Sequence, residues 1–239
     1  MVEKIEINNK REDKSETKSL ILQATGKFTF LFILLGLCYF LTAGTLLFWE
    51  AWLFIGIFFV IMLFFLRFLV KNDPDLLRRR LQTGEKRKEQ KFIIRISNII
   101  LLTIFLLPGL DRRWNWSSVP IWLVFVSDGI FALGYVIFFK VLKENSFASR
   151  TVQVEQKVQK VITTGPYSYV RHPMYTSIFL MFGIMPLALG SYWGLITLPL
   201  LILLMAIRIH DEEKMLCEEL EGYNDYKQRT KYKIIPFIW

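Results

Sequence analysis

An arginine and a histidine stand side by side in the stretch GPYSYVRHPMY. Pro173 can open a helix, because its missing N–H is not needed in a first turn. Backbone N–H groups at such a helix start can bind an anion, and Arg171 and His172 lie directly before it. The stretch therefore predicts either a site for a polar ligand or a pair of interfacial anchors, with Tyr167 and Tyr175 as aromatic residues of the membrane interface.

A second pair of ionisable residues lies four positions apart, at Arg208 and Glu212. Residues with this spacing share one face of a helix. Arg208 follows a long apolar run, and an ionisable residue at the end of a membrane helix is a candidate functional residue. The alternative is an ordinary ion pair, worth about 0.3–0.5 kcal/mol. Asp128 lies within another apolar run, and there a structural hydrogen bond is the simpler interpretation.

Metal and nucleotide chemistry receive little support from the sequence. The two histidines, His172 and His210, are far apart, and Cys38 and Cys217 form no metal-binding or disulfide pattern. The charged run at 210–213 follows an apolar segment, as a solvated helix face does. No GxGxxG follows a predicted strand, and no phosphate-binding loop of the Walker type occurs. We therefore expect no metal site and no nucleotide domain of the soluble type.

The elements that must position these residues are long apolar segments. Hydrophobic residues make up 53% of the 239-residue chain, more than in ordinary soluble domains. The segments are 28–49, 52–70, 92–110, 119–141, 175–190 and 193–209. Most of them approach the ~20 residues that a membrane helix needs. They predict an all-α integral membrane protein with about five to six transmembrane helices, of which the two shorter ones form a C-terminal helical hairpin.

Lysine and arginine are distributed unevenly around these segments. All but two of the 30 Lys and Arg residues lie in the amino-terminal tail, in 67–95, in 140–171 or in 208–233. Only Arg112 and Arg113 lie in the turns between them. Because positive charge gathers on the cytosolic side, this distribution predicts six spans with both termini cytosolic, in a prokaryotic inner or plasma membrane. Six of the seven tryptophans flank the three opposite turns, where interfacial indoles are expected.

The same pattern divides the chain into three regions. Residues 1–27 form a polar cytosolic tail, and 28–141 carry four transmembrane helices with a basic cytosolic loop at 71–91. Residues 142–239 form the third region, with a cytosolic loop, the hairpin and a cytosolic C-terminal helix. The net charge of +9 lies in blocks beside apolar runs, which is typical of contact with anionic lipid headgroups. No nucleic-acid-binding motif accompanies it, so the predicted partner is the bilayer.

Several stretches together resemble the isoprenylcysteine carboxyl methyltransferase family, in particular its prokaryotic membrane branch. The stretches are GPYSYVRHPMY, LALGSYWG, RIHDEEKML and GYNDYKQRTKYKIIPFIW, with further likeness in DPDLLRRRL, LPGLDRRWNWSSVP and NSFAS. The resemblance covers residues 70–239 and is strongest from 145 onward, although RHPxY alone is shared with phospholipid N-methyltransferases. It implies an integral membrane enzyme that transfers a methyl group from S-adenosylmethionine. It also implies that residues 142–239 are the catalytic region, with a cofactor loop before the hairpin.

The resemblance also implies roles for numbered residues of this chain. Arg208 matches an arginine that faces the substrate, and Arg208 and Glu212 are the implied catalytic residues. Gln159 stands where the family often has histidine, and the match at Gln153 needs a one-residue gap. The implied cofactor-binding residues are Gln153, Gln159, Lys160, Val161, Ile162, Tyr167, His172, Pro173, Met174, Tyr175 and Glu212.

These features predict a methyltransferase that acts at the membrane interface on a lipid-like or prenylated acceptor. A carboxylate acceptor is already ionised and suits pairing with Arg208, whereas an amine needs a base such as Glu212 or His172. A carboxyl or thiol methyltransferase is therefore the first hypothesis, and a phospholipid N-methyltransferase is the second. A membrane reductase, or a membrane protein without catalysis, is the alternative of another class.

Overall fold

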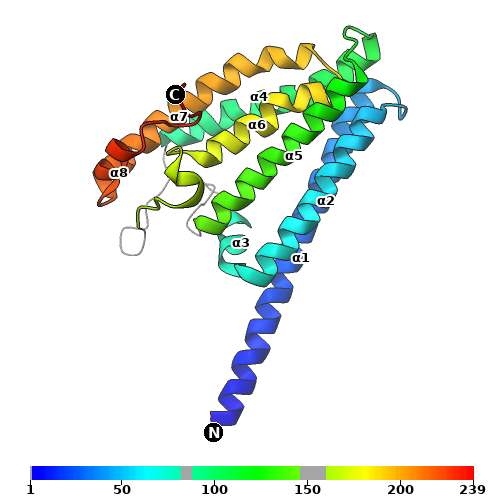
Figure 1. The fold of residues 1–239 in the computed structure, drawn as a ribbon. Helices are drawn as coiled ribbons and strands as arrows, with labels where there is room; N and C mark the ends of the chain where they lie inside the picture. The colour runs from blue at the N-terminus through cyan, green and yellow to red at the C-terminus, as the bar shows by residue number, and fades with distance from the viewer. Residues whose placement is uncertain (1, 82–87, 146–159) are drawn as a thin grey trace.

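The computed structural model of the chain describes residues 2–81, 88–145 and 160–239, with side chains described for 18–81, 95–145 and 160–239. This part consists of helices and contains no strand (Figure 1). The α-helices are α1 (Val2–Ala43), α2 (Trp49–Asn72), α3 (Pro74–Leu81), α4 (Lys88–Trp114), α5 (Ile121–Glu144), α6 (Pro173–Ala188), α7 (Leu198–Glu219) and α8 (Tyr223–Arg229), and the short 3-10 helices are η1 (Gly165–Ser168) and η2 (Trp193–Thr197).

Four helices of the described part are long and apolar enough to cross a membrane. They are Lys18–Ala43 within α1, Trp49–Asn72, Ile121–Glu144 and Trp193–Glu219, the last of which joins η2 to α7. The first of them begins ten residues before the predicted segment 28–49, because α1 continues without a break through the boundary predicted at residue 27. These four helices confirm that the protein is all-α and integral to the membrane.

Two further helices that the sequence predicted as spans are not among these four. The helix α4 has 27 residues, and in the part of it whose side chains are described, charged residues stand at Arg95 and from Asp111 to Arg113. The helix α6 has 16 residues, fewer than the ~20 that cross a bilayer without help from neighbours. The described residues thus contain four candidate spans, and the expected total of five to six, with crossing by α4 and α6, stays a prediction.

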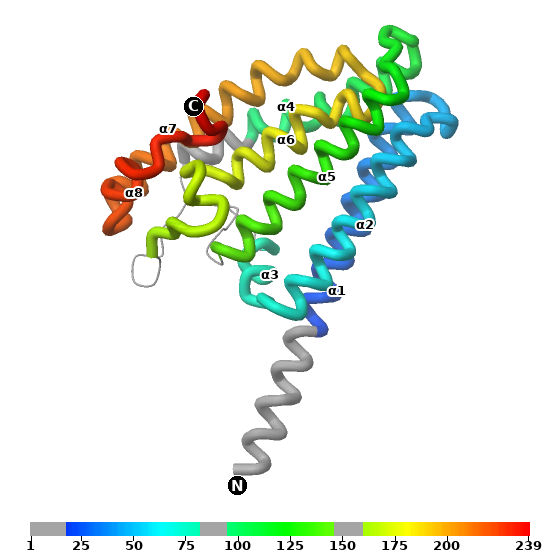
Figure 2. The backbone as a smooth tube through the Cα atoms, viewed as in Figure 1, coloured from blue at the N-terminus to red at the C-terminus, as the bar shows by residue number. Residues whose placement is uncertain are grey.

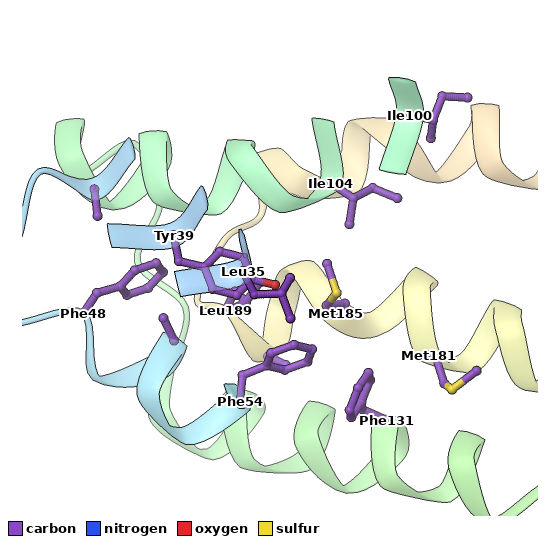
Figure 3. Packing of buried hydrophobic residues seen from close by; sticks show 13 residues of the cluster. Leu35, Tyr39, Phe48, Phe54, Ile100, Ile104, Phe131, Met181, Met185 and Leu189 are labelled. Carbon is purple, nitrogen blue, oxygen red and sulfur yellow. The ribbon is translucent and has the colours of Figure 1, made fainter. Parts of the chain in front are cut away.

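The core of the bundle is aromatic and lies where four helices meet. Tyr39 of α1, Phe54 of α2 and Phe131 of α5 are almost completely buried, and they converge on Met185 of α6 (Figure 3). The rings of Phe54 and Phe131 lie 4.6 Å apart. Since aromatic side chains bury large areas in fixed geometry, this cluster holds α2 against α5 and α6.

The helices α5 and α6 pack closely because of a glycine. A Cβ atom at Gly134 would lie 2.7 Å from the Cγ atom of Met181, so only glycine allows the two backbones to approach this far. Small residues at such contacts are typical of membrane helix pairs. The pairing brings the end of α5 beside the start of α6, where the motif GPYSYVRHPMY lies (Figure 2).

A polar network ties the turns together at the other end of the bundle. The carboxylate of Asp111 is 1% exposed; it accepts hydrogen bonds from the backbone N–H and the hydroxyl of Ser117 and from the hydroxyl of Ser191. The indole rings of Trp116 and Trp193 lie 6.0 Å apart. The turns after α4 and α6, which the sequence predicted to lie on the same side, therefore meet.

Candidate active site

The predicted site residues gather around one cavity. Its volume is about 840 Å³, within the range of ligand pockets. The predicted residues that line it are Lys160, Val161, Ile162, Tyr167, His172, Pro173, Met174, Tyr175, Arg208 and Glu212. Gln153 and Gln159 lie outside the described residues. Segments that are about 50 residues apart in the sequence thus contribute to a single pocket.

The turn GPY is anchored to the end of α5. The hydroxyl of Thr164 donates to the carboxylate of Glu144 over 2.9 Å, and the amide of Asn145 donates to the hydroxyl of Tyr167 over 2.8 Å. Gly165 has a φ of +57°, a conformation that residues with a Cβ rarely adopt. Burial raises the pKa of Tyr167 to about 12, although the Asn145 hydrogen bond acts in the opposite direction. The Tyr167 hydroxyl therefore enters the cavity as a neutral group.

Gly165→Ala should loosen this turn. The left-handed conformation costs an alanine about 1–2 kcal/mol, and the new Cβ would lie 2.8 Å from the Cγ atom of Glu144. We expect a lower melting temperature in detergent and weaker binding of any ligand that contacts Tyr167. The matched control is Gly129→Ala in α5, where a Cβ would meet nothing within 4 Å. Equal behaviour of the two variants would contradict the argument.

The arginine of the RHP motif is held by a buried carboxylate. The Nε atom of Arg171 lies 2.6 Å from Oε1 of Glu213, and its Nη1 atom donates to the carbonyl oxygens of Thr230 and Lys231, each at 2.8 Å. The side chains of Arg171 and Glu213 are 5% and 6% exposed. The guanidinium therefore joins the start of α6, the helix α7 and the C-terminal segment.

His172 contributes to the same contact and also lines the cavity. Its Nε2 atom lies 3.3 Å from Oε1 of Glu213, and Lys233 approaches the other oxygen of Glu213 at 3.3 Å. Backbone N–H groups of Arg171 and His172 donate to the carbonyls of Tyr232 and Lys233. Many polar groups of the RHP turn thus form contacts that stabilise the fold. A contact between His172 and a cofactor stays a prediction.

Sequence reasoning missed Glu213. The run at 210–213 was interpreted as a solvated face, and His210 is indeed exposed. However, Met205, Ile209 and Glu213 form the buried stripe of α7 at intervals of four residues. This periodicity is a signal in the sequence that Glu213 points inward and needs a cationic partner.

A tyrosine hydroxyl connects the two residues of the predicted catalytic pair. The Nε atom of Arg208 donates to the hydroxyl of Tyr175 over 2.9 Å, and that hydroxyl donates to Oε2 of Glu212 over 2.7 Å. All three residues line the cavity. The i,i+4 spacing correctly placed Arg208 and Glu212 on one helix face, while the bridge through Tyr175 of α6 was not predicted.

The cavity changes character along α7. Its lining from this helix is, in order, Leu201, Leu204, Met205, Arg208, Glu212, Met215 and Leu216. The charged pair therefore lies between an apolar end within the candidate span and a second apolar end near α8. Phenylalanine rings from α2 and α5, among them Phe54, Phe58 and Phe131, extend the first of these ends between the helices.

The basic helix α3 takes part in the cavity wall. The sequence predicted this segment as a headgroup anchor. Leu76 and Leu77 are buried, and the guanidinium of Arg80 lies over the ring of Phe138, 4.9 Å from its centroid. Arg80 lines the cavity, whereas Arg78 forms an exposed pair with Asp75. One arginine of the run thus faces the site.

Asp128 does not belong to this cavity lining. Its side chain is buried in α5, and within the described part of the chain neither carboxylate oxygen has a hydrogen-bond partner. The structural hydrogen bond that the sequence favoured for it is therefore not seen among the described residues.

The lining suits a ligand such as S-adenosylmethionine, which combines charged groups with an aromatic base. Glu212 and Arg208 can meet charged or hydroxylated parts, and Tyr167 and Tyr175 offer ring faces that attract a sulfonium. The hydroxyl of Tyr223 is buried at the cavity and has no partner among the described residues. A buried hydroxyl without a partner is unfavourable, so a ligand with polar edges fits this lining.

Comparison with known proteins points to the same chemistry. Residues 122–221 match the phospholipid methyltransferase family. Methanethiol S-methyltransferase of Crocosphaera subtropica (strain ATCC 51142 / BH68) is 27% identical over 164 residues, which make up 64% of this chain and 63% of that relative. The chain therefore covers less than two thirds of the relative's length.

These comparisons support the wider methyltransferase prediction and do not single out the isoprenylcysteine carboxyl branch. The matched residues include nearly all of α5 and the whole of η1, α6 and α7, which carry most of the cavity's polar residues. Methyltransferases of the phospholipid methyltransferase family use S-adenosylmethionine. Residues 122–221 are accordingly similar to the phospholipid methyltransferase family, and methyl transfer from S-adenosylmethionine is the chemistry that this similarity supports.

Proposed function

We propose that the protein is an S-adenosylmethionine-dependent methyltransferase that modifies a lipophilic acceptor at the membrane interface. The observation that carries this proposal is the position of Arg208, Tyr175 and Glu212. They form a charged section of a cavity that is lined on one side of this section by apolar side chains of candidate spans. A soluble cofactor and a lipid-like acceptor can meet only where such a boundary exists.

The cofactor is assigned to the part of the cavity that lies on one side of this charged section and is formed by the 160–175 segment, α7 and α8. Lys160, Val161, Ile162, Tyr167, His172, Pro173, Met174, Tyr175 and Glu212 are its proposed partners, together with Gln153 and Gln159 outside the described residues. When bound, S-adenosylmethionine supplies an electrophilic methyl group on a sulfonium. The protein's part is to align the acceptor and to exclude water, and alignment alone can contribute several kcal/mol.

The acceptor group proposed first is a carboxylate. It is ionised at neutral pH and needs no base, so Arg208 can orient one oxygen while the other attacks. Glu212 already accepts the Tyr175 proton in a hydrogen bond, which makes it a poor candidate for removing a proton from an amine. This arrangement supports an anionic nucleophile over an amine, which must lose a proton before it can attack.

A thiolate is the second candidate, because the relative described above is a methanethiol S-methyltransferase. Arg208 would favour the anionic form of a thiol in the same way. The long apolar part of the cavity supports a larger acceptor than methanethiol for this chain. An amine acceptor, as in phospholipid N-methylation, is supported by the family match alone.

The membrane arrangement is part of the proposal. With the site on the cytosolic side, the bilayer with its anionic headgroups faces the basic segments, and both termini are cytosolic. The helices α4 and α6 cross as parts of the bundle, although α6 is short for a span with its 16 residues. Their polar ends meet in the network of Asp111, Ser117 and Ser191, so unpaired groups are avoided there.

The function is tested by methyl transfer from labelled S-adenosylmethionine into lipid and peptide extracts of the host. We expect label in a membrane-soluble product that mild base releases as methanol, as it does from a methyl ester. A base-stable thioether would favour the thiol acceptor, and a base-stable quaternary amine the phospholipid headgroup. Failure of the purified protein to bind S-adenosylmethionine would refute the proposed function.

A further inference from the structure

The hydroxyl of Tyr223 is the most prominent unused group in the cavity. Tyr223 is the first residue of α8 and is 3% exposed. Its hydroxyl has no hydrogen-bond partner among the described residues, and its side chain lines the cavity. Burial, followed by the nearby charge of Glu213, raises its pKa, so the group is a neutral donor. Nothing in the sequence motifs discussed above assigns it a role.

The immediate surroundings of Tyr223 are apolar and aromatic. Leu220, Tyr223 and Tyr226 form one buried cluster, against which Val161, Tyr167 and Leu216 pack. The rings of Tyr223 and Tyr226 lie 5.8 Å apart at 62°. Apolar and aromatic surroundings with the Tyr223 hydroxyl as a donor suit a flat heteroaromatic ring whose edges form hydrogen bonds.

The neighbouring hydroxyl of Tyr226 is used differently. It donates to the carbonyl oxygen of Tyr167 over 2.7 Å and so fastens α8 to the turn η1. The two tyrosines are three residues apart on one short helix, yet among the described residues only the hydroxyl of Tyr226 has a protein partner. The contrast indicates that the hydroxyl of Tyr223, unlike its ring, is not needed to hold the fold.

The order of the lining residues along α7 indicates where each end of the proposed cofactor lies. The acceptor side is the apolar stretch around Leu204, and the charged section of the cavity follows at Arg208 and Glu212. Leu216 lies eight residues after Arg208, which is about 12 Å along a helix. The sulfonium must face the acceptor, so the part of the cofactor farthest from it, the adenine, belongs at the Tyr223 end.

We propose that the box formed by Val161, Tyr167, Leu216, Leu220, Tyr223 and Tyr226 binds the adenine of S-adenosylmethionine, with the Tyr223 hydroxyl as a hydrogen-bond partner of the base. The inference rests on the proposed function, because it assumes that this cofactor enters the cavity. It adds α8, which no cofactor motif of the chain includes, to the binding site.

The test compares Tyr223→Phe with the unsubstituted protein, both purified in detergent. S-Adenosylhomocysteine and 5′-methylthioadenosine, which lacks the amino-acid end, serve as probes for equilibrium binding. We expect Tyr223→Phe to weaken both ligands by the same factor, between about three- and ten-fold. The ligand-free variant should melt at the same temperature or higher, since the change removes a buried hydroxyl without a partner.

Tyr226→Phe is the matched control, because it removes a hydroxyl that has a protein partner. We expect it to lower the melting temperature of the ligand-free protein, whereas Tyr223→Phe should leave this temperature unchanged or raise it. Unchanged binding of S-adenosylhomocysteine to Tyr223→Phe would overturn the inference while leaving the proposed function intact. A loss confined to S-adenosylhomocysteine, with 5′-methylthioadenosine unaffected, would move Tyr223 to the amino-acid end and also overturn it. No binding to the unsubstituted protein would refute the function itself.

Discussion

Arg208→Lys should leave the affinity for S-adenosylmethionine nearly unchanged and lower the rate of methyl transfer by about 5- to 150-fold, the equivalent of one charged hydrogen bond of ~1–3 kcal/mol. Lysine keeps the charge but lacks the planar fork that orients an oxyanion. It also cannot reproduce the Nε contact of Arg208 with the Tyr175 hydroxyl. The measurements are cofactor binding at equilibrium and single-turnover methyl transfer.

Glu212→Gln should have the complementary effect and raise the dissociation constant for the cofactor. Its carboxylate accepts from Tyr175 and offers a second oxygen to an amino group or to ribose hydroxyls. A neutral amide loses the charge-assisted part of both contacts. The matched controls are Arg113→Lys and Glu218→Gln, since both residues are exposed and neither lines the cavity. They should leave binding and turnover unchanged.

Exchange of the two charges separates the proposed roles from a structural one. A tyrosine hydroxyl both donates and accepts, so Tyr175 could keep its two partners if Arg208 and Glu212 were swapped. A purely structural triad would therefore survive in the double variant Arg208→Glu and Glu212→Arg. Recovery of near-normal methyl transfer in that variant would show that neither residue has its own ligand.

Glu213→Ala should destabilise the protein more than any other single change discussed here. It would leave the guanidinium of Arg171 buried without its carboxylate, and breaking a buried ion pair by removing one partner costs about 3–5 kcal/mol. His172 and Lys233 would lose the same acceptor. We expect a large fall in melting temperature in detergent and weaker cofactor binding, because α7 would lose its contact with Arg171, and the C-terminal segment would be held to the start of α6 only by the remaining hydrogen bonds.

Glu218→Ala is the control for this change, because its side chain lies on the exposed face of the same helix. Surface substitutions of this kind usually change stability by less than about 0.5 kcal/mol. Glu213→Gln should fall between the two, since the amide keeps the shape and one acceptor oxygen. If Glu213→Ala has the same melting temperature as Glu218→Ala, the buried contact does not hold the fold together.

The sequence by itself determined the class of the protein and the helix faces that carry chemistry. Long apolar runs are required wherever a helix meets lipid, so the spans in α2 and α5 were predicted within a few residues. The last candidate span begins at the predicted residue, Trp193, but continues to Glu219, ten residues beyond the predicted end. The four-residue interval between Arg208 and Glu212 placed them on one face because the helical repeat is local. The motif GPYSYVRHPMY was likewise identified as the junction between loop and helix, with Pro173 opening α6.

Only the tertiary structure decided which polar groups meet. Glu212 and Glu213 are neighbours of the same type, yet one faces Tyr175 in the cavity and the other is buried against Arg171. No local pattern specifies a contact between residues that are about 40 positions apart. The packing of α7 on α6 places the two carboxylates in different surroundings. The C-terminal segment, which lies against Arg171, completes the burial of Glu213.

The tertiary structure likewise added groups from stretches to which the resemblance assigns no site residue. Arg80 reaches the cavity because Leu76 and Leu77 bury one face of α3, and Tyr223 does so because α8 folds back onto the turn η1. The sequence signals for both residues are weak, since an arginine run and a tyrosine near the C-terminus are common at membrane surfaces. The packing of neighbouring helices decides whether such a side chain faces lipid headgroups or a ligand.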